Sequence, residues 1–156
     1  MNSNISKKIL YFGIYEPTAP RDKVYVEGLK KLGFEFLPCV DNSAGLSKFF
    51  RLAKKFRSIK NDCDIVWVGY LSTMVVPLVW LLSRKQIVFN ALDSWYDRVV
   101  LDRGMYSRFS PVAWIIWCVD FLAFHVSDIV LVESEQQKLF ISKKFFVNPA
   151  KLTTVF

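Results

Sequence analysis

Residues 89–98, FNALDSWYDR, place four polar side chains directly after an apolar run that is typical of a buried strand. These side chains are Asp93, Ser94, Asp97 and Arg98. A carboxylate at a strand end can accept a hydrogen bond from a substrate hydroxyl, orient it or take its proton. The alternative is structural, because Asp93 or Ser94 can cap the helix that follows. Both can hold at once, with Ser94 as the cap and Asp93 pointing outward beside Asp97 and Arg98.

Two other segments carry charges where an apolar run ends. Arg21 and Lys23 follow the first run at the start of a helix, where they can contact a phosphate or a carboxylate, or can simply be solvated. Glu133 ends the fifth run, and Ser134 is expected to cap the next helix. His125, the only histidine, lies in an apolar helix and is expected to be a satisfied core or interface residue.

The elements that must position these groups alternate regularly along the chain. The expected strands are 7–14, 34–40, 64–69, 85–92, 128–133 and 152–156. The expected helices between them are 21–33, 46–59, 72–84, 109–126 and 134–145. Uniformly apolar strands that alternate with helices predict a Rossmann-like α/β domain, a three-layer sandwich with a mostly parallel sheet covered on both faces. We expect one such domain over residues 1–156, with ligands outside the carboxyl ends of the strands.

The formal charge of +7 is not spread evenly along the chain. Six basic residues and no acidic one lie between Lys48 and Lys60. We expect the helix 46–59 either to lie on an anionic membrane surface or to pack its apolar stripe on the sheet with its charges solvated. The candidate membrane-surface residues are Lys48, Arg51, Lys54, Lys55 and Arg57. Trp114 and Trp117 favour a bilayer interface, and no nucleic-acid-binding motif accompanies the charge.

Several classes of chemistry lack their usual residues. The first loop, GIYEPTAPRDK, has neither GxGxxG nor a Walker A motif, which disfavours NAD or FAD, and no cofactor is expected. No GxSxG turn and no pairs of zinc ligands occur, so no metal is expected. Three distant cysteines fit a reduced, cytosolic setting. The apolar segment 111–126 is short for a membrane span and contains Asp120, so we expect a cytoplasmic protein that can lie peripherally at the inner face of the plasma membrane.

Three stretches that cover most of the chain resemble the N-terminal half of family-4 glycosyltransferases with the GT-B fold. They begin KKILYFGIYEPTAP (7–36), DIVWVGYLSTMVVP (64–103) and SDIVLVESEQQKLF (127–156). The resemblance implies two Rossmann-like domains facing each other across a cleft, the N-terminal one binding the acceptor and the C-terminal one the sugar nucleotide. It also implies that Asp93 lies close to the acceptor and the transferred sugar.

The same resemblance makes Arg21, Tyr70 and Glu133 further candidates for the cleft. The glycine-rich first loop of many family members is absent, which argues against a donor-phosphate contact from this half. The sequence stops at TTVF, near the point where the family passes into its second domain. We therefore expect the donor-binding half to be missing from this chain and to be supplied by a longer polypeptide or by a partner chain.

The leading hypothesis is an acceptor-binding half of a glycosyltransferase. Its partners would be a nucleotide-sugar donor held by the missing half, a saccharide or lipid-linked acceptor, and an anionic membrane surface. Such a chain would be an enzyme only together with the donor-binding half. The alternative is a non-catalytic Rossmann-like module that binds a partner or a membrane.

Overall fold

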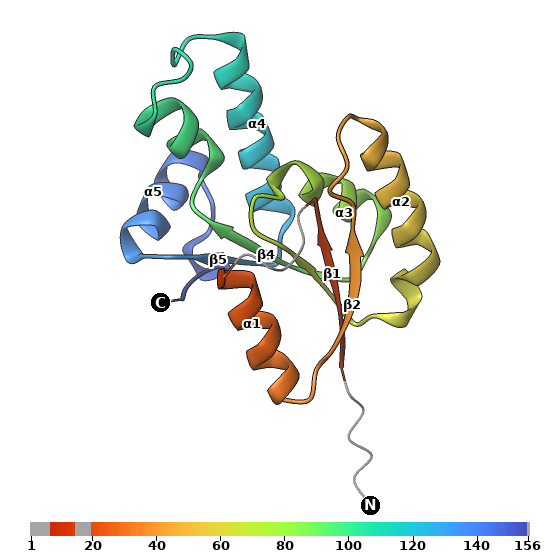
Figure 1. Cartoon of the computed structure of the whole chain (residues 1–156). Coiled ribbons are helices and arrows are strands. Elements are labelled where there is room, and N and C mark those ends of the chain that lie inside the picture. The colour runs from red at the N-terminus through yellow and green to blue at the C-terminus, as the bar shows by residue number, and fades with distance from the viewer. Residues whose placement is uncertain (1–6, 15–19, 156) are drawn as a thin grey trace, which may run out of the picture.

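The apolar runs form one six-stranded sheet in which all neighbouring strands are parallel (Figure 1). The computed structural model describes residues 7–14 and 20–155, apart from the side chains of Pro20 and Arg21. The strands are β1 (Lys8–Gly13), β2 (Glu35–Val40), β3 (Ile65–Val68), β4 (Gln86–Leu92), β5 (Ile129–Val132) and β6 (Leu152–Thr154). Their order across the sheet is β2-β1-β3-β4-β5-β6. The predicted Rossmann-like sandwich is confirmed, and its sheet is entirely parallel.

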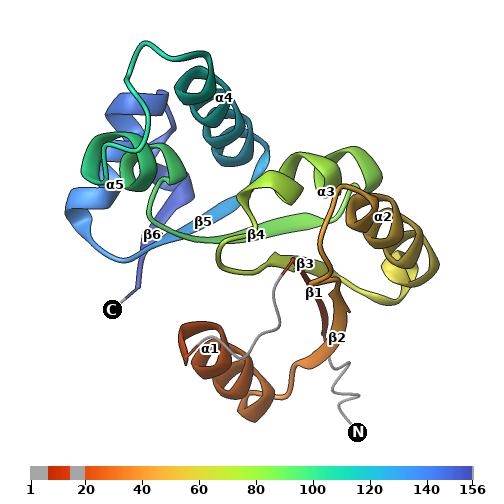
Figure 2. The same ribbon diagram turned by 45° about the horizontal axis from the view of Figure 1, so that its top comes forward.

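Helices cover both faces of the sheet, and among the described helices α1 alone lies on its face (Figure 2). The α-helices are α1 (Pro20–Lys31), α2 (Ser47–Ile59), α3 (Val76–Leu82), α4 (Pro111–Val126) and α5 (Glu135–Phe145). Shorter turns are the 3-10 helices η1 (Lys60–Asp62), η2 (Thr73–Val75) and η4 (Pro149–Lys151), and the π-helix η3 (Asp97–Asp102). The larger core lies between the sheet and α2 to α5, and the smaller core lies under α1.

The two cores follow from the alternation of side chains along each strand. In β1, Leu10 and Phe12 enter the larger core, whereas Ile9 and Tyr11 enter the smaller one. Successive side chains of a strand point to opposite faces, so a continuous apolar run fills both cores. The T-shaped contact of the Phe12 and Phe56 rings, with centroids 5.4 Å apart, ties β1 to α2.

Helix ends lie where the sequence places capping residues. Gly33 follows α1 with a φ of +88°, and Phe34 N–H donates to the Leu29 carbonyl at 3.1 Å, which is the Schellman pattern. Ser134 accepts a hydrogen bond from the Gln137 amide at the start of α5, as predicted. Pro77 lies in the first turn of α3, where its missing N–H costs nothing.

The apolar stripe of α2 is packed on the sheet. Leu52 and Phe56 are fully buried, and Phe49 and Ile59 pack against the same core. The predicted packing of this stripe on the sheet is therefore confirmed, and a membrane contact of the charged side of α2 stays a prediction. Arg51 on that side pairs with Asp41, its Nε 2.7 Å from the carboxylate.

Candidate functional site

A polar pocket lies at the carboxyl ends of β4 and β5. It has a volume of about 460 Å³. Its lining residues come from the segment after β4, from η3, and from the start of α5. They are Asp93, Asp97, Arg98, Leu101, Asp102, Glu133 and Gln137. Parallel sheets bind ligands outside the carboxyl ends of their strands, so the pocket occupies the expected place.

The turn that presents Asp93 has an unusual backbone. Leu92, the last residue of β4, has a φ of +64°, and the pairing of β4 with β5 shifts register between Asn90 and Leu92. Asp93 N–H donates to the Ala91 carbonyl at 2.8 Å, which closes a three-residue turn. A leucine in the left-handed region is strained, and such residues cluster at functional sites. The strain at Leu92 therefore marks this strand end as a candidate site.

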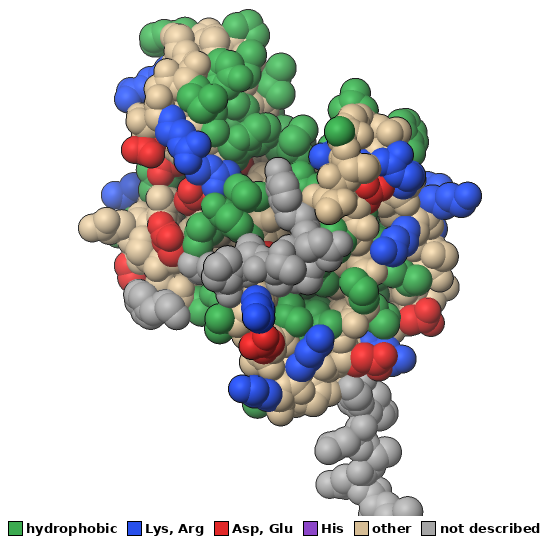
Figure 3. All heavy atoms as spheres, in the orientation of Figure 1, with side chains coloured by type: hydrophobic (Ala, Val, Ile, Leu, Met, Phe, Trp, Pro, Cys, Tyr) green, Lys and Arg blue, Asp and Glu red, His purple; other side chains and the backbone are tan. Residues whose placement is uncertain are grey.

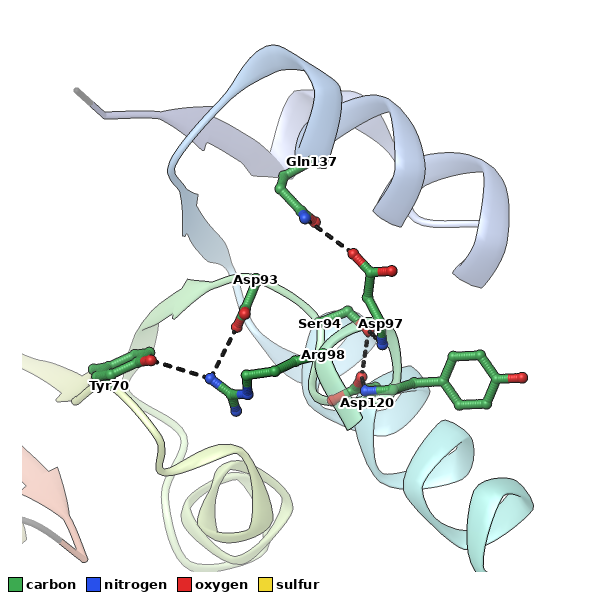
Figure 4. A network of polar contacts seen from close by, with 8 residues as sticks. Tyr70, Asp93, Ser94, Asp97, Arg98, Asp120 and Gln137 are labelled. Carbon is green, nitrogen blue, oxygen red and sulfur yellow. Dashed lines mark hydrogen bonds and ion pairs between the residues drawn. The ribbon is translucent and has the colours of Figure 1, made fainter. Parts of the chain in front are cut away.

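Asp93 and Arg98 form the charged centre of the pocket (Figure 4). Nη1 of Arg98 donates to Oδ1 of Asp93 at 3.2 Å and to the Tyr70 hydroxyl at 3.1 Å. Both charged side chains keep slightly less than a fifth of their surface exposed. Burial raises the pKa of the Asp93 carboxyl, the guanidinium of Arg98 opposes that effect, and the charge of Glu133 adds to it. Asp93 is thus a more basic carboxylate than a solvated one.

Ser94 has a supporting position instead of a position at the rim. Its side chain is fully buried, and its hydroxyl accepts a hydrogen bond from the Asp97 amide at 3.0 Å. The same hydroxyl donates to Oδ2 of Asp120 at 2.7 Å. Ser94 therefore caps the short helix that carries Asp97 and Arg98, and Asp93 faces the pocket. In this segment Ser94 thus has the capping position and Asp93 the position at the pocket, and a contact of Ser94 with a substrate stays a prediction.

Asp120 reaches the same helix start from α4. Its Oδ2 accepts hydrogen bonds from the Tyr96 amide at 2.8 Å and from Ser94, whereas its Oδ1 is buried without a partner. Burial raises the pKa of Asp120 to about 7, against the lowering effect of those two hydrogen bonds. The sequence showed this residue only as an interruption of an apolar helix. A single carboxylate in such a helix is the signal for a buried polar contact.

The far wall of the pocket is held by Asp97 and Gln137. Nε2 of Gln137 donates to Oδ2 of Asp97 at 3.0 Å and so joins α5 to η3 (Figure 4). Glu133 is exposed at the mouth, and its backbone amide donates to the Leu92 carbonyl at 3.2 Å. The predicted residues Tyr70, Asp93, Asp97, Arg98 and Glu133 are thus brought together. The π-helix η3, which was not expected from the sequence, is what orients Asp97 and Arg98.

A second polar cluster, which the sequence did not single out, lies at the ends of β1, β3 and β4. Asp22 is 1% exposed and accepts three hydrogen bonds. The donors are the Tyr11 hydroxyl at 2.7 Å, the Asn90 side-chain amide at 2.7 Å and the Tyr70 backbone amide at 3.0 Å. Asn90 interrupts an apolar strand, and such a polar residue predicts a buried hydrogen bond. The cluster fixes Tyr70, whose hydroxyl in turn accepts from Arg98.

Gly69 lies against this cluster. A Cβ at this position would stand 2.0 Å from the Tyr11 hydroxyl, so only glycine permits the close approach. The change of strand order, from β1 outward to β2 and back to β3, places the usual ligand crevice here. In the described part of this region the buried side chains of Tyr11 and Asn90 both donate hydrogen bonds to Asp22.

Other predicted residues lie elsewhere. The side chain of Arg21 is outside the described part of the chain, although its backbone belongs to the first turn of α1. The basic residues of α2 do not line the polar pocket. His125 is half-buried, its Nδ1 2.8 Å from the Phe121 carbonyl and its ring stacked on Phe121.

The arrangement suits binding of a polyhydroxylated molecule. Carboxylates of Asp93, Asp97 and Glu133 can accept hydrogen bonds from hydroxyls, and Arg98 can donate to their oxygens. Within the described residues, no group of three or more His, Cys, Asp or Glu side chains has a geometry that could hold a metal ion. A basic carboxylate fixed beside a hydroxyl is the minimum that is needed to orient it or to accept its proton.

No protein-family model matches the chain, and no curated protein matches it either. The likeness to family-4 glycosyltransferases therefore stays a prediction.

Proposed function

We propose that this chain is the acceptor-binding half of a glycosyltransferase, in which the polar pocket holds a hydroxyl-bearing acceptor. The observation that carries the proposal is the Asp93 carboxylate, which is presented to the pocket by a strained turn and held there by Arg98. The Rossmann-like fold and the resemblance of the sequence support the same function. Donor binding would come from a second Rossmann-like unit, on the same polypeptide or on a partner chain.

In this proposal Asp93 accepts a hydrogen bond from the acceptor hydroxyl and fixes its direction. Its raised pKa makes it a better proton acceptor than a solvated aspartate, and Arg98 keeps the carboxylate in place. Asp97 and Glu133 would accept hydrogen bonds from neighbouring hydroxyls of a saccharide or lipid-linked acceptor. Asp93 would position the acceptor hydroxyl and would not attack the sugar itself.

The test uses the protein as it is isolated from its native cells, together with any polypeptide that accompanies it. Mass spectrometry gives the size of the endogenous protein, which tells whether the donor half is on the same chain. The preparation is then assayed for sugar transfer from a panel of nucleotide sugars to a lipid and saccharide extract of the same cells. Asp93→Asn is expected to lower turnover at least about tenfold and to leave the fold intact.

Asp62→Asn is the matched control, because Asp62 is an exposed carboxylate in η1, outside the pocket. It should leave turnover unchanged. Full turnover in Asp93→Asn would remove this residue from the site. If the undegraded endogenous protein transferred sugar from no donor, the alternative of a non-catalytic module would be favoured. The exposed apolar surface of α4 is consistent with that alternative as well.

A further inference from the structure

The beginning of α4 and the segment before it form an exposed apolar surface, here called the α4 tip. It consists of Met105, Tyr106, Phe109, Val112, Trp114 and Ile115. Phe109 is 89% exposed, Trp114 60% and Ile115 62%. In the space-filling view, hydrophobic side chains gather over the upper end of α4 (Figure 3). Contiguous apolar surfaces of this kind mark sites of interaction with a protein or a membrane.

The exposure of the tip follows from the composition of α4. The helix is apolar on nearly every side, as helices buried all round usually are. Only one side packs in the core, through Ala113, Ile116 and Phe124. The outer side, which includes Val112, Ile115 and Leu122, has no cover within the described part of the chain. Among the described residues, no helix is long and apolar enough to cross a membrane.

The charges around the tip favour an anionic bilayer as its occupant. Arg103 and Arg108 are exposed within the segment, and no acidic residue occurs between Asp102 and Asp120. Aromatic side chains such as Trp114 and Tyr106 are favoured at the level of lipid headgroups. Basic residues near the surface add electrostatic attraction to anionic lipids.

A separate pocket adjoins the tip between α4 and α5, and we call it the basic pocket. It has a volume of about 310 Å³ and is lined by Tyr96, Arg108, Ala113, Trp114, Trp117 and Lys144. These lining residues include two cations and no anion, and the walls are aromatic. Lys144 Nζ lies 5.2 Å from the centre of the Tyr96 ring, so its charge is directed toward the pocket wall. This combination fits a phosphate attached to an apolar chain.

We propose that the α4 tip docks into an anionic phospholipid bilayer and that the basic pocket holds the phosphate of a lipid headgroup. Phe109, Ile115 and Trp114 enter the interface, while Arg108 and Lys144 bind the phosphate. This surface replaces the basic side of α2 as the membrane contact. The docking does not depend on sugar transfer and would hold equally for a non-catalytic module.

The experiment is sedimentation of the full chain with vesicles of phosphatidylcholine alone and of phosphatidylcholine mixed equally with phosphatidylglycerol. The unmodified protein is expected to bind the mixed vesicles and to bind neutral ones weakly. Arg108→Glu with Lys144→Glu should weaken binding to the mixed vesicles at least about tenfold. Phe109→Ser with Ile115→Ser should weaken it by a similar factor, because binding scales with the buried apolar area.

The control is Lys54→Glu with Lys55→Glu on α2, which changes the net charge by the same amount. It should weaken binding no more than about twofold, the effect of long-range charge alone. Circular dichroism checks that each variant is folded, which is expected because the changed side chains are largely exposed. A further arm adds inorganic phosphate at constant ionic strength, and a lipid site predicts that free phosphate will not displace the protein.

Three results would overturn the proposal. The first is that the unmodified protein does not sediment with the mixed vesicles. The second is that the α2 control loses as much binding as the variant of the basic pocket. The third is complete displacement by inorganic phosphate, which would make the basic pocket a site for a free anion.

Discussion

The two polar clusters at the carboxyl edge of the sheet differ in what their carboxylates can still bind. The Asp22 carboxylate is 1% exposed and accepts three hydrogen bonds from the protein. Asp93 has one charged partner and faces a pocket of about 460 Å³. Tyr70 joins the two, because its amide donates to Asp22 and its hydroxyl accepts from Arg98. The cluster around Asp22, here called the closed cluster, thus stabilises the fold. The cluster around Asp93, here called the open cluster, retains hydrogen-bonding capacity for a ligand.

The largest expected effect comes from breaking the closed cluster. Asp22→Ala would leave three buried donors without an acceptor, and each such group costs free energy. We expect the free energy of unfolding to fall by about 3 kcal/mol or more, measured by urea denaturation. Tyr11→Phe removes one donor and should cost about 1 kcal/mol. Asp62→Ala, an exposed control, should change the value by less than about 0.5 kcal/mol. If Asp22→Ala and Asp62→Ala lowered the free energy of unfolding equally, the Asp22 cluster would not be the stabilising one.

The second prediction concerns Asp120 of α4, which holds the start of the helix that carries Asp97 and Arg98. Its carboxyl titrates near 3.8 in an unfolded chain and near 7 in the folded protein. Between these values the folded state holds one proton more, so the stability contributed by this group falls as the pH rises through 7. The loss between about pH 5 and pH 8 is expected to be about 2.5 kcal/mol.

Asp120→Asn removes that titration and retains an oxygen for Ser94 and the Tyr96 amide. The variant should therefore lack this part of the decline in stability, as measured by urea unfolding at both pH values. Comparing two pH values cancels any constant cost of the substitution. Identical pH profiles for the variant and the unmodified protein would show that Asp120 is ionised throughout.

The contrast between the clusters also shows what the sequence could reveal. The strands were predictable because a buried parallel sheet requires continuous apolar runs, and Gly33 and Ser134 marked helix ends through local geometry. Asp93 and Arg98 were found because they follow such a run. Asp22 was missed because its three donors come from residues 11, 70 and 90, which only the fold brings together. The π-helix at 97–102 was missed because the contacts at its start come from Asp120 and Gln137, which are distant from it in the sequence.

The smallest expected effect on stability comes from the open cluster itself. Asp93→Asn combined with Arg98→Gln removes both charges of a largely buried ion pair at once, so that no unpaired charge is left behind, and replacing both partners of such a pair is often close to neutral. We expect the free energy of unfolding to change by less than about 1 kcal/mol under the urea conditions used for Asp22→Ala. A loss as large as that of Asp22→Ala would make the pair part of the scaffold. A small loss would mean that the ion pair hardly stabilises the fold. The strained backbone of Leu92, which presents Asp93, would then be better explained by a function of the pocket than by the stability of this pair.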